Sequence, residues 1–554
     1  MDQVKIFALG GLDEDGKNMY CVEINQSIFV IESGMKYPDN ERLGIEMVIP
    51  DFTYLVENAN RVKGIFITHG HEDVMAALPN LLKQIQVPVY ATPLTAQILE
   101  RKLKKESVNN ANIQRIQRNS TFQIAGQNII TFGVTQSIAD AVGIAIETSN
   151  GYVVYTSEFI IDYDTKMEAF KTDIDQFIEI GKKGVLALMA ESVGATRIGH
   201  TAPHHRITPI MEPMFEDAQD RVIVTMYNQN LYRVIEVVEL AYKYGRKIVF
   251  YDDELRQMMK DVSDLGYYRM PVGMEISKER YSSDMENVLI LISGDGSTIF
   301  KKVHKIATKA DDLIEFRPSD TIIIASPAVP GTEMEATKME NDLYKEGAKI
   351  HSIVSKQMFS MHASIEDLKM MLYLFKPAYY IPVKGEYRHL IANANVALGM
   401  GHKSTDILVM DCGQVATFEQ GVLKESATFI KLEEVFVDGK ENLDTTGMVL
   451  RDRETLSTEG TIIVGVVVDF KTKEVIGGPD VQSRGVIYLK DSEHIVKAAG
   501  DILEKTIRDA VSENRYDNAN CRMEAREKII KYVLKETGKK PMVLPAIVEI
   551  KTTE

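Results

Sequence analysis

Residues 64–82, GIFITHGHEDVMAALPNLL, decide the fold of this chain. The β-branched run IFIT predicts a buried strand, and apolar residues follow it at helical spacing. His69, His71 and Asp73 fall between them, at the carboxyl end of the strand, where open α/β sheets place their sites. Two histidines one residue apart present two nitrogen donors on one side of an extended chain, which suits one divalent cation. The stretch therefore predicts a metal site, with a polar loop that binds no metal as the alternative.

Val74 stands directly after Asp73, and its side chain cannot bind metal. A carboxylate at Asp73 reaches toward a second cation, but a two-ion site needs more donors than this stretch offers. We therefore expect a centre that descends from a metal site rather than an intact one.

Length and composition describe an ordinary globular protein. The chain has 554 residues, too many for one core, so two to four domains are expected. Hydrophobic content is 45% and charged content 26%, and no apolar run is long enough to cross a bilayer. Three cysteines lie far apart and form no CxxC pair, as a reducing compartment permits. A cytoplasmic protein with no membrane association is expected.

The net charge is −16, which argues against non-specific coating of nucleic acid but leaves room for a locally basic channel. Strand-like and helix-like runs alternate along the chain. A second α/β block begins near residue 204, and each of its strands precedes a helix or turn, which predicts a parallel sheet. Strands and two helical stretches after about residue 460 predict a small terminal α/β domain.

The chain resembles bacterial ribonuclease J, a family of the metallo-β-lactamase superfamily with an inserted β-CASP domain. The resemblance covers essentially the whole chain and rests on several long segments. They are GGLDEDGKNMY (10–20), GIEMVIPDFTYL (44–55), ITHGHED (67–73), SIADAVGIAIETS (137–149), ASPAVPGTE (325–333), HASIEDLKMMLYLFKP (362–377), IPVKGEYRHLI (381–391) and RDRETLSTEG (451–460).

This resemblance implies an α/β architecture: a metallo-β-lactamase αββα sandwich, an inserted β-CASP α/β domain and a small C-terminal α/β domain that helps the protein oligomerise. We expect the sandwich in residues 1–203 and 367–440, and the β-CASP domain in 204–366. A linker is expected at 441–460 and the oligomerisation domain at 461–554. Members of the family degrade RNA from a 5′-monophosphate end, some also cut internally, and they use two zinc ions.

The resemblance also implies a set of metal ligands, and three of its histidines are replaced here. Val74, Gln136 and Lys384 stand where the family has histidines, while Glu158 stands where it has a bridging aspartate. One ion would keep His69, His71 and Glu158, with the Gln136 amide oxygen as a poor fourth ligand. The other would keep only Asp73 and Glu158. An ammonium from Lys384 near those two carboxylates would replace the charge of an ion without generating a nucleophile; a solvated loop lysine is the alternative.

The β-CASP motifs imply further site residues. Asp73, Glu191 and His362 match catalytic positions, and Tyr232 stands where the family has a histidine, with packing in a helix face as the alternative. The phosphate-binding positions are Ser360, His362, Ala363, Ser364 and Arg388. Their loop enters a helix whose N-terminus favours anions, and Ser364 with Asp367 also has the spacing of a helix cap.

Three functions follow from this pattern. The first is a ribonuclease J paralogue with a degenerate centre that acts in RNA processing and decay as a structural and RNA-binding subunit beside an active ribonuclease J. The second is a slow, manganese-dependent 5′-to-3′ exoribonuclease, with endonuclease activity as a further option. The third is a free-standing binder of RNA 5′ ends. At most one weakly bound zinc or manganese ion, or none, is expected, with RNA bearing a 5′-monophosphate and homo- or hetero-oligomers (dimer or tetramer) as partners.

Overall fold

The computed structural model describes residues 2–38, 45–329, 332–354, 356–438, 441–442, 448–486 and 493–551. It divides into two compact units, Met1–Tyr37 with Met47–Glu434, and Pro38–Glu46 with Val435–Glu554. Within the described ranges, no helix combines the length and the apolar character that a membrane crossing requires.

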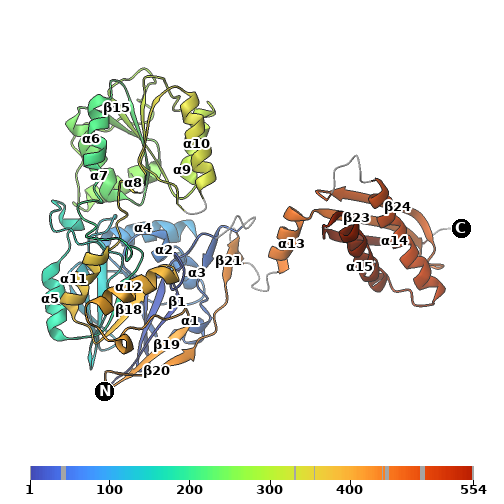
Figure 1. Ribbon diagram of the computed structural model, residues 1–554, viewed down its shortest axis with the longest axis horizontal. Coiled ribbons are helices and arrows are strands. Elements are labelled where there is room, and N and C mark those ends of the chain that lie inside the picture. The colour runs from blue at the N-terminus through green and yellow to red at the C-terminus, as the bar shows by residue number, and fades with distance from the viewer. Residues whose placement is uncertain are drawn as a thin grey trace. The chain divides into compact units, whose positions relative to one another are not determined.

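Two mixed sheets form the lower part of the first unit in Figure 1. The larger has the order β20-β19-β1-β2-β3-β5-β6-β7 and the smaller the order β18-β12-β11-β10-β9-β8. The strands of the larger sheet are β1 (Gln3–Gly10), β2 (Met19–Ile24), β3 (Ser27–Ile31), β5 (Val62–Ile67), β6 (Val89–Ala91), β7 (Ile113–Arg115), β19 (Gln414–Glu419) and β20 (Val422–Phe429). Those of the smaller are β8 (Thr121–Ile124), β9 (Gln127–Gly133), β10 (Val142–Thr148), β11 (Gly151–Tyr155), β12 (Val185–Glu191) and β18 (Tyr379–Val383). A short strand, β4 (Met47–Ile49), lies outside both sheets.

Apolar side chains from both sheets meet in one core, which includes Ile6, Phe29, Ile144 and Met189. Helices cover the outer faces, so the layers are helix, sheet, sheet, helix, and the predicted αββα sandwich is confirmed. The helices of this part are α1 (Thr53–Glu57), α2 (Glu72–Met75), α3 (Leu78–Leu82), α4 (Pro93–Lys105), α5 (Ile174–Lys183), α11 (Ile365–Phe375) and α12 (Tyr387–Gly399).

The upper part of the first unit is a parallel sheet of order β14-β15-β13-β16-β17 between two helical layers (Figure 1). All its paired strands run parallel, as the sequence predicts. Its elements are α6 (Thr208–Asp217), β13 (Val222–Tyr227), α7 (Leu231–Lys243), β14 (Lys247–Phe250), α8 (Asp253–Asp264), β15 (Val288–Gly294), α9 (Thr298–Ala307), β16 (Thr321–Ile324), α10 (Glu333–Lys345) and β17 (Lys349–Ser352). Helices α6, α7 and α8 cover one face, and α9 and α10 cover the other.

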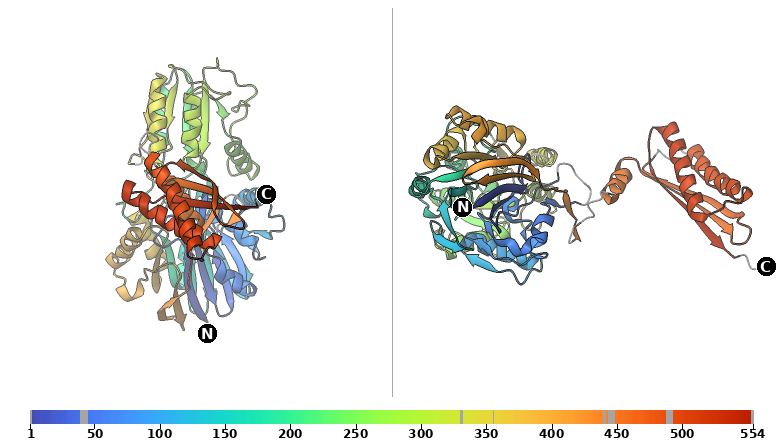
Figure 2. Two further views of the ribbon diagram at one scale, coloured as in Figure 1. Left: turned by 90° about the vertical axis from the view of Figure 1, so that its right-hand side faces the viewer. Right: turned by 90° about the horizontal axis from the view of Figure 1, so that it is seen from below.

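The second unit contains a three-stranded sheet of order β24-β23-β25, with α14 and α15 on one face (Figure 2). Its elements are β21 (Val435–Asp438), β22 (Glu441–Asn442), α13 (Met448–Thr458), β23 (Thr461–Asp469), β24 (Val475–Arg484), α14 (Glu493–Ser512), α15 (Asn518–Thr537) and β25 (Met542–Ile550). Helix α13 lies inside the span predicted as a linker, of which residues 443–447 lie outside the described part. The boundaries predicted for the domains stay predictions.

Candidate metal centre and the cleft around it

The predicted metal-site residues come together at one edge of the two-sheet sandwich. His69, His71 and Asp73 follow β5, as predicted from the sequence, while Glu158 follows β11 and Lys384 follows β18. Together with Gln136 they line a cleft of about 850 Å³, except for His69, which lies deeper. Its opposite wall is the carboxyl edge of the parallel sheet. The loop that carries Asp73 approaches closely to Gly34, where a Cβ would lie 1.5 Å from the Asp73 carbonyl oxygen.

The two histidines are held so that one ring nitrogen of each faces the other. His69 Nδ1 lies 2.9 Å from the Thr68 hydroxyl, which donates its own hydrogen to Glu32. His71 Nε2 lies 3.3 Å from the carbonyl oxygen of Gln229, which can only accept. Both outer nitrogens are therefore the protonated ones in the neutral rings, and the lone pairs of His69 Nε2 and His71 Nδ1 face each other at 3.1 Å.

Burial keeps both rings neutral. Desolvation, and then the neighbouring His71, holds the pKa of His69 well below its usual value, and desolvation lowers the pKa of His71 to about 4. Two facing lone pairs in a buried place repel each other unless a cation lies between them. Glu158 completes the set, with its carboxylate oxygens 3.7 Å from His69 Nε2 and 3.8 Å from His71 Nδ1.

Lys384 lies between two carboxylates of the centre. Its Nζ is 2.5 Å from Asp73 Oδ2 and also contacts Glu158 Oε1. The lysine is only 2% exposed, its backbone N–H donates to the carbonyl of Gly11 at 3.0 Å, and its φ is +58°. Although burial raises the pKa of Asp73, the Lys384 ammonium outweighs it and holds that pKa well below the usual range.

These residues fit one ion and not two. The donor atoms of His69, His71 and Glu158 lie within 4.8 Å of one another, and a divalent cation held there would activate a bound water. The Gln136 amide group donates to Glu158 instead of offering its oxygen inward. Around Asp73 the fit fails, because Val74 is apolar and fully buried and an ammonium already holds the carboxylate.

Glu191 and His362 anchor the loop that precedes α11. His362 Nδ1 lies 2.7 Å from Glu191 Oε2, and the other Glu191 oxygen accepts the backbone N–H groups of Phe159 at 2.8 Å and Ala363 at 3.0 Å. Burial opposes a charge on His362, but the Glu191 carboxylate raises the pKa of His362 above its usual value. His362 Nδ1 is also 3.9 Å from Glu158, so the loop reaches the centre.

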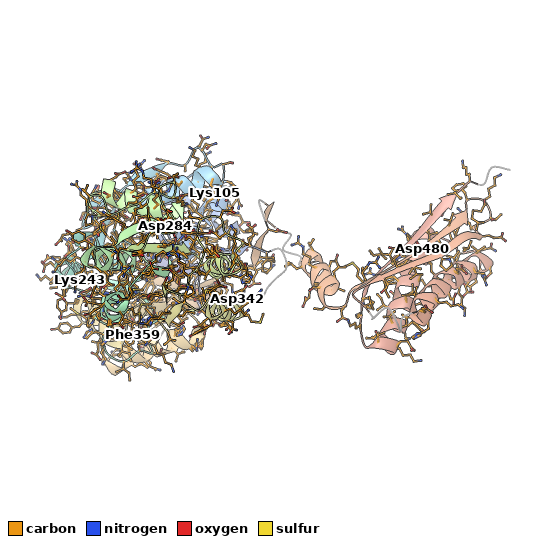
Figure 3. All side chains as sticks on the ribbon, turned by 90° about the horizontal axis from the view of Figure 1, so that it is seen from above. Lys105, Lys243, Asp284, Asp342, Phe359 and Asp480 are labelled. Carbon is orange, nitrogen blue, oxygen red and sulfur yellow. The ribbon has the colours of Figure 1, made fainter. Side chains whose placement is uncertain are left out.

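The predicted phosphate-binding residues differ in what they offer. Ser360 is exposed in the cleft, and its carbonyl is held by the Arg197 guanidinium at 2.9 Å, beneath which lies the ring of Phe359 (labelled in Figure 3). Ser364 is buried, and its N–H donates to Asp367 at 3.0 Å within a capping box. A phosphate would have to compete with carboxylates for the Ala363 and Ser364 amides.

Two further predicted positions lie away from the cleft lining. The side chain of Arg388 is 73% exposed and pairs with Glu386 at 2.7 Å. Tyr232 is 3% exposed, packs edge-on against Phe170 and donates its hydroxyl to Asp162 at 3.3 Å. The surroundings of Tyr232 therefore agree with the alternative of packing in a helix face.

Some residues around the centre are not apparent from the sequence. Glu32 stands behind His69 through Thr68, and burial raises the pKa of Glu32 to about 7. Asp295 lies in the cleft opposite the centre, after β15. Only the second carries a signal in the sequence, since an acid between two glycines directly after a strand marks a strand-end loop.

Four family models match the chain in succession. They are described as "Beta-lactamase superfamily domain" (46–195), "Ribonuclease J, beta-CASP domain" (219–343), "Zn-dependent metallo-hydrolase RNA specificity domain" (348–407) and "Ribonuclease J C-terminal domain" (448–550). A crystal structure titled as a protein of unknown function from Enterococcus faecalis V583 is similar in fold alone. It shares 13% identity and a TM-score of 0.51, over 75% of this chain and 100% of that chain.

Curated relatives match from end to end. Ribonuclease J2 of Bacillus subtilis (strain 168) is 32% identical over 551 residues, which cover 99% of each chain. Ribonuclease J 2 of Streptococcus pyogenes serotype M3 is 31% identical over 556 residues, which cover 100% of each. Full-length relatives, successive domain models and the sandwich with its inserted parallel sheet agree, and the chain belongs to the ribonuclease J family.

Proposed function

We propose that this protein acts in RNA processing and decay mainly as a structural and RNA-binding subunit, with a degenerate metal centre, in a complex with an active ribonuclease J. The position of Lys384 carries the proposal, because its ammonium touches both Asp73 and Glu158. Two-metal hydrolysis needs ions that lower the pKa of a water and neutralise the phosphate. An ammonium supplies a positive charge but no bound hydroxide, so the phosphate would be held and not attacked.

RNA binding is supported by the cleft and by the match of residues 348–407 to an RNA specificity domain. Arg197 and His362 stand at the loop, and the Ser360 hydroxyl is exposed there. Cations and hydroxyl groups of this kind contact the phosphates of nucleic acids. RNA with a 5′-monophosphate is the ligand we expect.

A second candidate function is a weak, manganese-dependent 5′-to-3′ exoribonuclease. The facing lone pairs of His69 and His71 favour it, because they leave a place for one cation beside Glu158. Mixed nitrogen and oxygen donors suit manganese as well as zinc. One ion could activate a water there, although the loss of the partner ion would make the reaction slow.

Hydrolysis of a 5′-monophosphorylated RNA decides between the two candidates. The purified chain and His71→Ala are compared with manganese, with magnesium and with a chelator, while binding of the same RNA is measured in parallel. Binding with no mononucleotide release in either protein is the result expected of a subunit. Release that the wild type shows and the variant loses would establish the exonuclease and overturn the proposal.

The partner is tested by mixing the chain with an active ribonuclease J from the same cell and measuring the mass of the complex in solution. We expect a hetero-oligomer at equal amounts of the two chains. Two separate species at micromolar concentration, with RNA bound by this chain alone, would favour the free-standing binder instead.

A further inference from the structure

The wall of the cleft opposite the metal centre contains a recess that the centre does not use. Tyr227, Asp295 and Gly296 line it from the parallel sheet, and Tyr37 lines it from the sandwich. Tyr227 ends β13 and Asp295 follows β15, so both stand at the carboxyl edge of neighbouring parallel strands. Ligands of such sheets bind at this edge. We call this place the Tyr37–Asp295 recess.

Asp295 is a half-buried carboxylate without a positive partner. Among the described residues, no lysine, arginine or histidine nitrogen lies within 4.0 Å of it. Asn228 Nδ2 donates to its Oδ2 at 3.1 Å. The ammonium of Lys302, from the neighbouring helix α9, is held elsewhere, by Asp252 and by the carbonyl of Ser293 at 2.7 Å. The Asp295 carboxylate therefore keeps acceptor capacity toward the cleft.

Charges on the elements around Asp295 contribute to disfavouring the ionised form of its carboxylate. Glu72 of α2 and Glu254 of α8 repel it, while Asn228 and the more distant Lys302 act in the opposite sense. Burial is the largest cause, and it raises the pKa of Asp295 to about 6. At neutral pH the Asp295 carboxylate is ionised but poorly stabilised by its surroundings. A ligand that donates hydrogen bonds to it would therefore bind favourably.

The charge of RNA limits which of its groups can face Asp295 in the cleft. A carboxylate repels the phosphates of RNA, so Asp295 must face a base and not the backbone. Guanine is the base whose Watson–Crick edge carries donors side by side, N1–H and the exocyclic amine, which match the two oxygens of one carboxylate. Adenine and cytosine offer one exocyclic amine next to an acceptor, and uracil offers a single N–H between two carbonyls.

The aromatic rings complete the recess. Tyr37 is 55% exposed, and its Cζ would lie 4.0 Å from a Cβ built on Gly296, so its ring stands beside the Asp295 loop. Tyr227 donates its hydroxyl to the carbonyl of Pro327 at 2.7 Å, which fixes the second ring in the wall. Exposed tyrosine rings are platforms on which single-stranded bases stack.

We propose that the Tyr37–Asp295 recess binds a guanine base, with the Asp295 carboxylate accepting N1–H and the exocyclic amine while Tyr37 stacks on the ring. RNA and free guanine nucleotides both carry this base. That RNA supplies the base rests on the proposed function, whereas the guanine site itself is inferred only from the residues of the recess. The protein would then prefer some RNA sequences over others by one base.

The test measures binding of 5′-monophosphorylated oligoadenylates that carry one guanosine, placed at each position in turn. We expect one position at which guanosine binds about 10-fold more tightly than adenosine, as a good bidentate contact gives. Inosine, which lacks the exocyclic amine, should lose most of that gain at the same position. Since this comparison uses the unaltered protein, it does not depend on how any variant folds.

Variants then assign the contact. Asp295→Asn turns one acceptor oxygen into a donor that opposes guanine and suits adenine, so it should abolish the preference for guanosine over adenosine. Asp284→Asn is the matched control, an exposed acid of the same part of the chain (labelled in Figure 3), and should keep the preference. The preference should also weaken as pH falls through about 6, since a protonated Asp295 accepts poorly.

Free guanosine monophosphate separates the two sources. Competition by this nucleotide at concentrations near the Kd of the guanosine oligonucleotide would make the free nucleotide the ligand, and competition only at a large excess would make RNA the ligand. Equal binding of guanosine and adenosine at every position, with no binding of guanosine monophosphate, overturns the proposal of a guanine site in the recess. Failure to bind any RNA overturns the proposed function alone, because guanosine monophosphate still tests the recess.

Discussion

At the scale of the residue, one side chain supplies the positive charge beside two carboxylates of the centre. Lys384 Nζ contacts the carboxylates of Asp73 and Glu158, and the lysine side chain is 2% exposed. The Glu158 side chain is 4% exposed and that of Asp73 is 30% exposed, so water compensates neither charge fully and the ammonium stabilises both. The backbone at Lys384 is left-handed, a conformation that few side chains adopt without support from their surroundings, and here the Gly11 carbonyl and the Ser192 N–H provide it.

Lys384→Met tests how much this charge contributes to the stability of the fold. Without the ammonium, two neighbouring carboxylates remain uncompensated, and the free energy of unfolding should fall by roughly 3–5 kcal/mol in a chelator. Manganese should restore part of the loss, because the carboxylates then become ligands. Urea denaturation with and without the ion measures both effects. Lys182→Met, at an exposed pair with Glu179, is the control and should change little. Unaltered stability of the Lys384 variant would contradict this account.

At the scale of the element, much of the sandwich could be predicted from the sequence. The β-branched run before His69 forms β5, and the helix-like runs of the sequence at residues 94–104 and 231–244 form α4 and α7. Strand β24 was missed, because its sequence VIGGPDVQSR contains the glycines and proline that usually mark turns. The run GVIYLKD (485–491) has the composition of a further strand, and it lies mostly outside the described residues.

Contacts between elements far apart in sequence could not be predicted in this way. The family resemblance placed Lys384 near Asp73 and Glu158, but only the fold shows that it touches both. Arg388 was expected at the phosphate, yet the turn of α12 directs it to solvent. Asp295 joins the cleft only because the inserted sheet faces the sandwich, and no local pattern carries that information.

The start of helix α11 fixes the loop at the centre, and Asp367 is its anchor. One carboxylate oxygen accepts the N–H groups of Ser364 and Thr201, both at 3.0 Å, in a fully buried place. Asp367→Ala leaves two buried donors unsatisfied, so the free energy of unfolding should fall by about 1–3 kcal/mol. Guanidinium denaturation measures it. Glu366→Ala, one residue away with a partly exposed pair to Lys369, should cost much less; equal losses would refute the anchor role.

At the scale of the whole molecule, the two units have separate cores. The second unit buries Val464, Leu503, Ile529 and Val543 among its own strands and helices. We expect residues 448–554 to fold when produced alone, with a cooperative thermal transition in circular dichroism. The full chain should then show two transitions in calorimetry. A fragment that melts without cooperativity would mean that its core needs the first unit.

The ammonium of Lys384 is covalently tethered, and this has a consequence for how the centre depends on the supply of metal ions. A metal ion bound at such a place exchanges with the solution, so its occupancy depends on the concentration of free metal. A side chain cannot be leached out or replaced by a competing ion. The balance of charge around Asp73 is therefore set by the amino-acid sequence itself, and it stays the same whether free metal is abundant or scarce.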